Sequence, residues 1–453
     1  MRRTMLGITM GIMVAGIGCS AYGADNVGLL HAGTAKVDIT PAPGTGVTLL
    51  RAKLADRDHL YARALVLKSD QTSVAIVSMD LILFSSAKVV AEAKAKWKVD
   101  HVILCSTHTH VGMVPEGLFI GGGRGDWTRG GDPATIIDWP ALSKDPWYAA
   151  TEEKIIAAIG KASKNIFPAT VSGARGPFQS AYMAHNRRLV GADGSVSPMW
   201  DNPRRLPTKP IDPTIGVIRV NDAQGKIRAF LVNYACHAVG TMNAGAVSKD
   251  YPGAMVDYVE EQLGDQCMAM FTQGAEGDQD PYDIVSGEHG FNLVKQAGIS
   301  VGKGALNVVE SVKLQPAGKP QSLAAKQSTL TLKYRNENKS SDVVLTTIVI
   351  NNNIALVSIP GEPFIQHQLD LRAKSPLPNT FLLGIAYSGA GTPFTVYIPT
   401  AQAVKEGGYG ASECSYLEPN AGEKIVDEGV ATIKALLNAD GKTAGSRKAV
   451  NLE

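Results

Sequence analysis

Two histidines separated by a single threonine follow a short apolar run. His108 and His110 lie in Cys105-Ser-Thr-His-Thr-His110, directly after Val102-Ile-Leu104. An apolar, β-branched run of this kind is typical of a buried strand. The crevice beyond the carboxyl ends of strands is the usual ligand site of open α/β sheets, and imidazole is the commonest metal ligand. We therefore expect a metal or acid/base site at this strand end.

Polar residues also follow other apolar runs. His237 comes after Tyr234-Ala-Cys236, Asp278 and Asp280 come after Met270-Phe271, and Glu362 comes after Ile359-Pro-Gly361. A catalytic zinc ion takes about three protein ligands from histidine and carboxylate and keeps a position for water. Two histidines and one glutamate form such a set.

Other interpretations of these residues stay open. His-x-His places both imidazoles on one face of a strand, which suits two ligands, or one ligand and a neighbouring acid/base group. A histidine is also a common hydrogen-bonded core residue. Glu362, in a Gly-Glu-Pro segment before a predicted helix, also suits the N-terminus of that helix, where the helix dipole favours negative charge.

The apolar periodicity predicts an α/β fold, with a mixed β-sheet core and flanking helices. The expected strands are residues 73–79, 102–105, 229–236, 267–271, 354–359 and 381–386. One expected helix follows Pro252 and ends at Gly264, and another begins near Pro363 and runs towards Lys374. A third includes Ile155 to Ala162, and a fourth covers Ile425 to Leu437.

The first 23 residues predict a cleaved secretory signal. They combine a basic start, an apolar stretch from Met5 to Ile17 and a small-residue exit at Ala21-Tyr-Gly23, after which we expect cleavage. Cys19 offers an alternative as a lipidated cysteine, but Gly16 stands where a lipobox prefers leucine. We therefore expect a periplasmic or secreted protein.

The composition limits the domain organisation and the partners. The mature chain of about 430 residues has no low-complexity linker or repeat, so we expect one domain over 24–438 and a polar tail over 439–453. Removing Arg2 and Arg3 with the signal balances the 44 basic and 42 acidic residues, which argues against nucleic-acid binding. No further segment of the mature chain predicts a transmembrane helix.

Two further features concern the cysteines and a long glycine-rich segment. Four cysteines remain after the expected signal, too few for a disulfide framework, and their pairing stays open: Cys105, Cys236, Cys267 and Cys414. Cys105 and Cys236 each close an apolar run, so we expect these two to be buried small side chains. The segment between His110 and Trp147 has many glycines and little apolar periodicity. Because it leaves directly from the histidine strand, we expect it to form a wall of the cleft.

Eight short segments, in order and spread over nearly the whole mature chain, resemble the neutral, non-lysosomal ceramidase family. The segments are Gly33-Thr-Ala-Lys-Val-Asp-Ile-Thr-Pro41, Leu60-Tyr-Ala-Arg-Ala-Leu-Val66, Ser106-Thr-His-Thr-His110, Asn186-Arg-Arg188, Ala235-Cys-His237, Gln273-Gly-Ala-Glu-Gly-Asp278, Pro360-Gly-Glu362 and Tyr397-Ile-Pro-Thr400. The resemblance implies the fold of the ceramidase catalytic domain. It implies a short form, because larger members continue into an immunoglobulin-like domain.

The resemblance also implies a zinc-dependent amide hydrolase and names its residues. Its zinc ligands correspond to four side chains: His108, His237, Glu362 and Tyr397. His110 resembles the family's neighbouring acid/base group, and Arg187 and Tyr409 resemble the groups that hold the substrate carbonyl. Without the resemblance, either tyrosine reads as an amphipathic ring packed at a surface turn.

One position departs from the family pattern. Ceramidases carry a nucleophilic serine in a Gly-Asp-x-Ser-Pro segment, whereas this chain reads Gly277-Asp-Gln-Asp-Pro281, with Asp280 in place of the serine. Zinc lowers the pKa of bound water to about 7, so water can attack a carbonyl directly while a carboxylate or imidazole takes the proton. Asp280 and His110 are the candidates for that proton.

The sequence thus predicts an exported zinc hydrolase of an amide or ester bond, with N-acylsphingosine as the substrate that the family implies. The chain is only 6% aromatic and shows no amphipathic lipid-docking helix, so a smaller non-lipid amide, ester or glycoconjugate is an alternative. A non-catalytic periplasmic zinc-containing binding protein is another. The acidic segment from Asp278 to Asp283 permits a second, structural Ca²⁺ or Mg²⁺ ion, although it equally suits a solvated turn.

Overall fold

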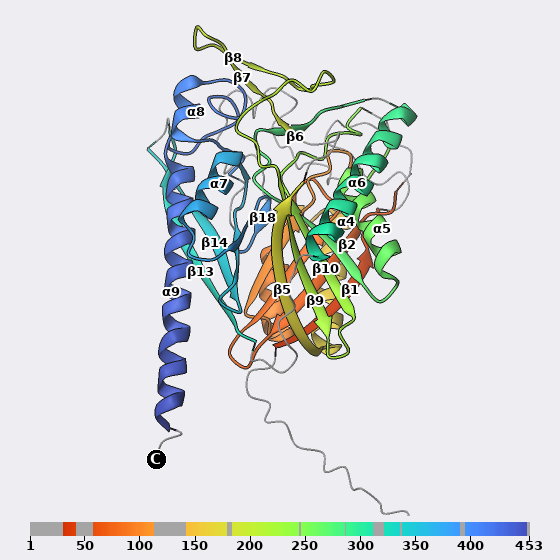
Figure 1. Ribbon diagram of the computed structural model, residues 1–453, viewed down its shortest axis with the longest axis vertical. Coiled ribbons are helices and arrows are strands. Elements are labelled where there is room, and N and C mark those ends of the chain that lie inside the picture. Colours follow the sequence, from red (N-terminus) through yellow and green to blue (C-terminus); the bar gives the residue numbers. More distant parts are fainter. Residues whose placement is uncertain are drawn as a thin grey trace, which may run out of the picture.

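The structure is a computed structural model that describes residues 30–41, 58–112, 142–178, 184–243, 246–285, 287–310, 321–335, 338–389 and 395–450. Two sheets lie at its centre and helices cover their outer faces (Figure 1). The predicted α/β class with a mixed sheet is confirmed. The predicted signal peptide and most of the glycine-rich segment after His110 lie outside the described residues. Within those ranges, no helix combines the length and apolar character that a membrane crossing requires.

The larger sheet has nine strands and mixes parallel with antiparallel pairs. Neighbours β10 and β11, and β3 and β4, run parallel, and the other pairs run antiparallel. Every residue of β3 is buried, as expected for a strand covered on both faces. In sheet order the strands are β11 (Met268–Gln273), β10 (Ile227–Tyr234), β9 (Thr214–Asp222), β5 (Phe167–Pro177), β1 (Leu30–Asp38), β2 (Tyr61–Lys68), β3 (Ser73–Met79), β4 (His101–Ser106) and β18 (Ala386–Tyr387).

A four-stranded sheet packs against the larger one. Its apolar face shares one core cluster with the large sheet, in which Ile354, Leu356 and Phe381 of the small sheet join Ile76 and Leu231 of the large one. The burial of these side chains is the main favourable term that holds the two layers together. The strands, in order, are β13 (Leu323–Lys333), β14 (Ser340–Ile350), β15 (Ile354–Ser358) and β17 (Asn379–Leu383).

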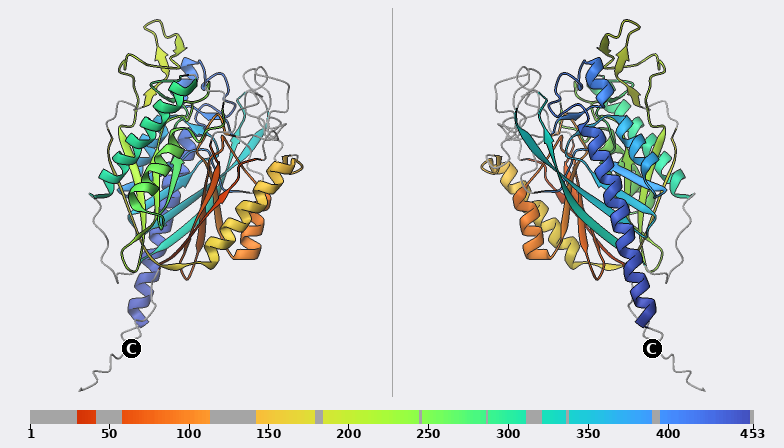
Figure 2. Two further views of the ribbon diagram at one scale, coloured as in Figure 1. Left: turned by 90° about the vertical axis from the view of Figure 1, so that its right-hand side faces the viewer. Right: turned by 90° about the vertical axis from the view of Figure 1, so that its left-hand side faces the viewer.

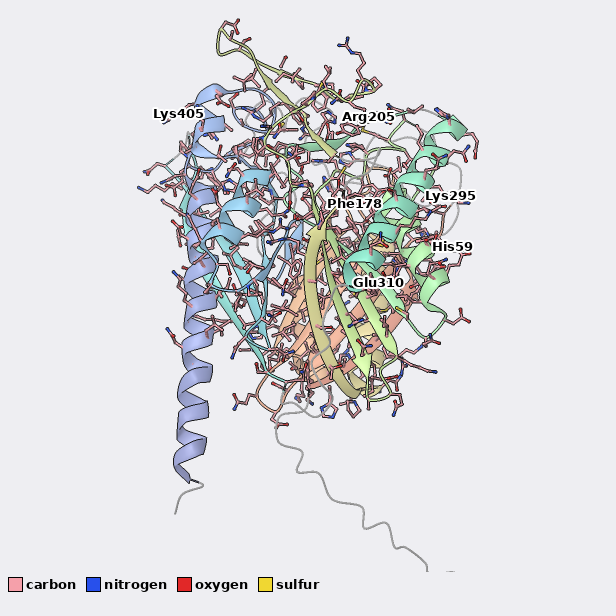
Figure 3. The ribbon with its side chains drawn as sticks, viewed as in Figure 1. His59, Phe178, Arg205, Lys295, Glu310 and Lys405 are labelled. Carbon is pink, nitrogen blue, oxygen red and sulfur yellow. The ribbon has the colours of Figure 1, made fainter. Side chains whose placement is uncertain are left out.

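The helices cover the outer faces of both sheets (Figure 2). Helices α1 (Ala87–Trp97) and α4 (Pro146–Lys164) pack near β1, β2 and β4, whereas α5 (Asp250–Leu263) and α6 (Gly287–Glu310) pack near β5, β9 and β11. Phe178, labelled in Figure 3, packs against Gly304 of α6. Its ring meets the Tyr234 ring edge-on, with 5.3 Å between the ring centroids. The smaller sheet is covered by α7 (Ile365–Lys374) and α9 (Ala421–Val450), with the short α8 (Ala401–Glu406) beside α9.

All four predicted helices are present. Gly264 follows the last residue of α5 as expected, and α4 begins with an Asp145 cap, whose side chain accepts from the Tyr148 amide, and with Pro146 in the first turn. Helix α9 continues to Val450, through most of the segment expected as a polar tail.

One predicted strand is wrong in its extent. Residues 381–386 do not form one strand, because the chain turns at Gly384 and Ile385, where Ile385 has a φ of 46°. β17 ends at Leu383 in the small sheet, and β18 begins at Ala386 in the large sheet, beside β4. The turn therefore carries the chain from one layer to the other, which an apolar run alone does not reveal.

The large sheet curls so strongly that strands far apart in its order lie close together. The Ser78 hydroxyl of β3 donates to the Phe271 carbonyl of β11 at 2.6 Å. The side-chain amide of Gln273 donates to the carbonyls of Thr107 (2.9 Å) and Cys236 (2.8 Å). These bonds join the carboxyl ends of β4, β10 and β11, where the sequence predicts the site.

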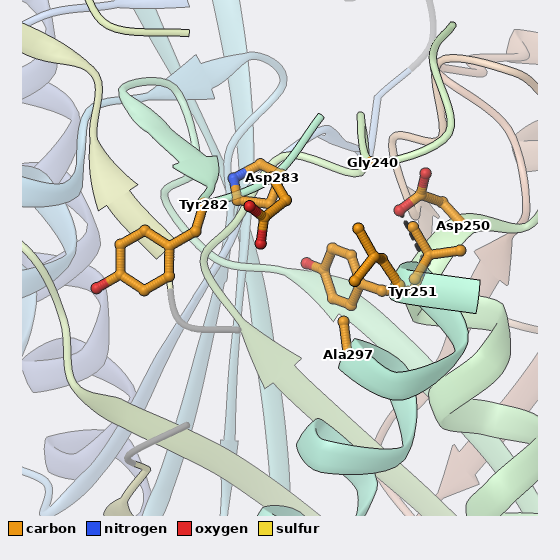
Figure 4. A pocket seen from close by; sticks show the side chains of 9 residues that line it. Gly240, Asp250, Tyr251, Tyr282, Asp283 and Ala297 are labelled. Carbon is orange, nitrogen blue, oxygen red and sulfur yellow. Dashed lines mark hydrogen bonds between the residues drawn. The ribbon is translucent and has the colours of Figure 1, made fainter. Parts of the chain in front are cut away.

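Cys105, Cys236, Cys267 and Cys414 are buried and free, and burial was expected for the first two. A small cavity of about 20 Å³ lies beyond His237 and is lined by Gly240, Asp250 and Tyr251, among others (Figure 4). The Tyr251 hydroxyl donates to the Cys236 carbonyl at 2.6 Å, so this region supports the strand end that carries His237.

A buried ion pair fixes the chain just before Leu81 and Ile82, whose carbonyls contact His108. Arg63 Nη1 donates to Asp80 Oδ2 at 2.9 Å, and the same oxygen accepts from the Tyr61 amide. Both charged side chains are fully buried. The carbonyl of the next residue, Leu81, accepts from the His108 amide at 3.0 Å. The pair therefore anchors one wall of the site.

We predict that Asp80→Ala lowers the free energy of unfolding by about 3–5 kcal/mol, because it leaves the Arg63 charge buried without a partner. The control is Asp427→Ala, which breaks the exposed pair between Lys374 and Asp427 and is expected to cost at most about 1 kcal/mol. Urea unfolding of both variants measures the difference. Equal losses in the two variants would contradict the anchoring role.

Candidate active site

Three predicted site residues meet at the converging strand ends. His237 Nε2 lies 3.1 Å from Glu362 Oε2, and His108 Nε2 lies 3.6 Å from the same oxygen. All three side chains are buried. His108 also has a φ of 65°, an uncommon backbone conformation for a residue with a side chain and one that occurs often at functional sites. The structure therefore brings these three residues together.

Hydrogen bonds to carbonyls set the orientation of both imidazoles. His108 Nδ1 lies 2.8 Å from the Ile82 carbonyl, and His237 Nδ1 lies 2.8 Å from the Glu276 carbonyl. Because a carbonyl only accepts, we place the proton of each ring on Nδ1, which leaves Nε2 as an acceptor facing Glu362. In this tautomer, the two Nε2 atoms and the Glu362 oxygen are all acceptors. A bound cation satisfies such a set, and carbonyl-oriented histidines are typical of metal sites.

His110 lies beside this cluster. Its Nε2 is 3.4 Å from His108 Nε2, and its ring meets the His108 ring edge-on at 4.9 Å. Burial lowers the pKa of His110 well below its ordinary value of 6.5, and the neighbouring His108 and His237 lower it further. His110 is therefore neutral near pH 7. Its position agrees equally with the two predicted roles, a ligand or a neighbouring acid/base group.

Tyr397 is held next to Glu362 by a short pair of strands. β16 (Glu362–Pro363) and β19 (Tyr397–Ile398) run parallel, with Glu362 opposite Tyr397 in the register. The Tyr397 hydroxyl lies 3.4 Å from the Tyr409 hydroxyl. Burial raises the pKa of Tyr397 well above 10, and the nearby Glu362 carboxylate adds to this effect. The phenol therefore needs an adjacent cation in order to ionise.

Arg187 lies against the two tyrosines. Its guanidinium carbon is 5.3 Å from the Tyr397 ring centroid and 5.0 Å from that of Tyr409. Nη1 donates to Asp280 Oδ1 at 3.0 Å, and Nη2 donates to the Gly277 carbonyl at 2.7 Å. Burial alone would lower the pKa of Arg187, but the Asp280 charge holds it well above its ordinary value. A permanent positive charge is thus fixed beside the cluster.

The structure places Asp280 on one side of His237. Asp280 Oδ1 lies 3.6 Å from His237 Nδ1, whereas Glu362 faces Nε2 on the opposite edge of the ring. Strands β12 (Gln279–Pro281) and β6 (Ala184–Asn186) pair so that Asp280 lies opposite His185. Asp280 is therefore close to the site, but its ion pair with Arg187 is its shorter contact.

Asp278 and Asp283, the other acids of the segment from Asp278 to Asp283, are engaged by protein groups. Asp278 accepts from the Asn186 amide (2.6 Å) and the Ile365 backbone N–H (2.9 Å), and Asp283 pairs with Arg205 (2.8 Å). These acids support the local structure. A second, structural cation in this segment stays a prediction.

Two residues at the site have no predicted role. Gln273 joins three strand ends, as described above, and Glu276 points its carboxylate into the cluster. Two overlapping groups can each place one ligand atom per residue within 4.8 Å of the others: His108, His110 and His237 in one, and His108, Glu276 and Glu362 in the other. Burial raises the pKa of Glu276 well above 4.5, and Glu362 adds to the effect. The only sequence feature that points to Glu276 is its place as an acidic residue among small residues at the end of a strand.

Comparisons with solved structures place this fold among the neutral ceramidases. The neutral ceramidase of Pseudomonas aeruginosa superposes with a TM-score of 0.67 at 16% identity, over 90% of this chain and 75% of that one. A ceramidase complexed with C2 superposes with a TM-score of 0.71 at 15% identity, over 91% and 76%. No family model and no curated protein matches the sequence. The chain has the neutral ceramidase fold. The resemblance of the eight segments is thereby confirmed at the level of fold.

We predict that a divalent metal ion stabilises the folded protein through the His108, His237 and Glu362 cluster. At a free Zn²⁺ concentration about 100-fold above the dissociation constant, the free energy of unfolding should rise by about 2.7 kcal/mol, and a chelator should reverse the gain. His237→Ala should abolish the metal-dependent part, because it removes one ligand.

The matched control is His367→Ala, which removes a buried histidine outside the cluster. This variant should keep the metal-dependent gain, whatever its baseline stability. Thermal unfolding with and without metal measures both. An undiminished gain in His237→Ala would contradict the proposed ligand set.

Proposed function

We propose that this chain is an exported, zinc-dependent, ceramidase-like hydrolase of an amide or ester bond. The observation that carries the proposal is the convergence of two imidazole Nε2 atoms and the Glu362 carboxylate, with both Nδ1 atoms directed at backbone carbonyls. Tyr397 adds a phenol oxygen from the neighbouring strand. Nitrogen and oxygen donors of these kinds suit zinc, and they occupy the positions that the ceramidase resemblance implies.

The groups around the cluster fit the hydrolysis of a carbonyl compound. A divalent ion held by these ligands would polarise the substrate carbonyl and make water a better nucleophile. His110 is neutral and adjacent, so it accepts the proton that the attacking water loses. Arg187 and Tyr409 donate to the oxyanion that forms on the substrate. Removing one such donor typically costs about 3 kcal/mol of transition-state stabilisation.

Asp280 fits a positioning role better than that of the base. Its carboxylate is paired with Arg187 and lies beyond the Nδ1 edge of His237, whereas His110 adjoins the Nε2 atom of His108. We therefore propose that Asp280 holds Arg187 in place. With aspartate where ceramidases carry serine, water is the proposed nucleophile.

An apolar surface near the site supports an acyl substrate. Of the large apolar side chains in the described ranges, the exposed ones are Ile166 and four in one stretch: Leu189, Val190, Trp200 and Leu206. This stretch contains the hairpin of β7 (Arg188–Val190) and β8 (Val196–Pro198), above the strand ends in Figure 1. The Trp200 ring meets Tyr409 edge-on at 4.8 Å. An exposed apolar side chain thus adjoins a proposed carbonyl-binding residue.

A smaller, polar substrate is the second candidate. A cavity of about 290 Å³ lies beside the site and has both polar and apolar lining, with Asn186, Arg188, Lys209 and Gln366 among the polar residues. These polar groups could orient a polar amide or glycoconjugate. A non-catalytic zinc-containing binding protein is the remaining alternative, but it has no need of the Arg187 and Tyr409 pair.

A panel of fluorogenic amides and esters, from acetyl to palmitoyl, should separate these alternatives. We predict metal-dependent hydrolysis with a rate that rises with acyl-chain length, because longer chains bury more apolar surface. Trp200→Ser should lower kcat/KM for the palmitoyl substrate more than for the acetyl substrate. Hydrolysis of the short substrates alone would favour the polar candidate, and zinc binding without any hydrolysis would favour the binder.

The role of Asp280 has its own test. We predict that Asp280→Asn retains the metal and loses about 10- to 100-fold in kcat, as is typical when a supporting contact is lost. In this variant, the pH–rate profile should still show its acidic limb, the fall in rate on acidification, at a pH below 6.5. The reason is that the pKa of His110 is lowered, so this base stays neutral to more acidic pH. Loss of that limb in Asp280→Asn would instead identify Asp280 as the base.

A further inference from the structure

The side chain of Glu276 is buried without a partner at the centre of the site. It is fully buried, and neither carboxylate oxygen has a hydrogen-bond partner within the part of the chain that the structure describes. One of its oxygens lies within 4.8 Å of ligand atoms of both His108 and Glu362. A buried carboxylate that lacks donors is costly, so its position calls for a charged partner.

The backbone fixes Glu276 where its side chain faces the cluster. Its carbonyl accepts from His237 Nδ1 at 2.8 Å, and the next residue, Gly277, donates its amide to the Pro363 carbonyl at 2.9 Å. Gly277 permits this close approach, because a Cβ there would lie 2.3 Å from the Glu362 carbonyl oxygen. The same residue therefore orients a predicted ligand through its backbone and reaches the cluster through its side chain.

The surrounding chain leaves space for this carboxylate. A Cβ at Gly384 would lie 2.6 Å from Glu276 Oε2, so only glycine fits there without a shift. Gly384 belongs to the turn that carries the chain from β17 to β18. The turn between β17 and β18, which the apolar pattern did not predict, thus forms one wall around Glu276.

No cation of the described residues pairs with Glu276. The nearby Arg187 directs Nη1 to Asp280 and Nη2 to the Gly277 carbonyl. The carboxylates of Glu276 and Glu362 and the imidazole of His108 can each place a ligand atom within 4.8 Å of the others, so one cation between them can contact all three groups. A divalent ion also balances two carboxylate charges.

We propose that Glu276 is a further ligand of the metal site, which makes it a centre with two carboxylates. The proposal rests on the same metal site as the proposed function and adds a ligand that the ceramidase resemblance does not name. A second carboxylate raises the share of hard oxygen donors, which favours ions such as Mn²⁺ relative to a site with one carboxylate.

The test is the metal affinity and cobalt spectrum of Glu276→Gln, which keeps the shape of the side chain and removes its charge. Affinities for Zn²⁺ and Mn²⁺ come from competition with a chromogenic chelator. We expect affinity for both ions to fall at least 10-fold, with the larger loss for Mn²⁺. The visible absorption of the Co²⁺-loaded protein should intensify, because losing one ligand lowers the coordination number.

The matched control is Glu152→Gln, which alters another fully buried glutamate outside the cluster. It should leave the affinities and the cobalt spectrum unchanged. Glu276→Gln should also unfold no more easily than the wild type when both are metal-free, because the Glu276 carboxylate has, among the described residues, no hydrogen-bond partner to lose. A fold defect would appear in this measurement, separately from the loss of metal.

The outcomes distinguish this proposal from the proposed function. A wild-type protein that binds no divalent ion would overturn both. A wild-type protein that binds metal, together with a folded Glu276→Gln variant of unchanged affinity and spectrum, would overturn the role of Glu276 alone.

Discussion

The site depends on a surplus of acceptors at one buried point. Two backbone carbonyls hold the Nδ1 protons of His108 and His237, so both Nε2 lone pairs face the Glu362 carboxylate. The folding of the chain brings these groups together, and although burial alone would raise the pKa of Glu362, His108 and His237 hold it well below its ordinary value. The carbonyl contacts fix both rings in an orientation that suits metal ligation.

The curvature of the large sheet is what permits this convergence. Strands β4 and β11 are far apart in strand order, yet the Gln273 side chain reaches both the Thr107 and the Cys236 carbonyls. The smaller sheet closes the site from the other side, because β15 leads to Glu362 and the turn after β17 leads back to β4. Residues from four distant stretches thus reach one point, which explains why the site needs nearly the whole chain.

Strands β3, β4, β10, β11 and β15 were predictable from the sequence, because buried strands are continuous apolar runs with polar residues at their ends. The other main strands were not predicted: β1, β2, β5, β9, β13 and β14. The same runs do not show where a chain changes layer, so the division between β17 and β18 was missed. Periodicity also cannot place Tyr397 beside Glu362, because their proximity depends on the register of two-residue strands; only the ceramidase resemblance indicated it. The role of Glu276 could not be predicted from periodicity either. The sequence Gly274-Ala-Glu-Gly277 is typical of a turn, and only the folded structure shows that the Glu276 carboxylate is buried without a hydrogen-bond donor in the described part of the chain.

The measurement that tests the central claim most directly is anomalous X-ray scattering from a crystal of the zinc-loaded protein, recorded on both sides of the zinc absorption edge. We expect one anomalous peak at the strand ends, at about 2.0–2.1 Å from the Nε2 atoms of His108 and His237 and from a Glu362 oxygen. A zinc-soaked crystal without a peak at this point, or with these side chains turned away from the ion, would contradict the account.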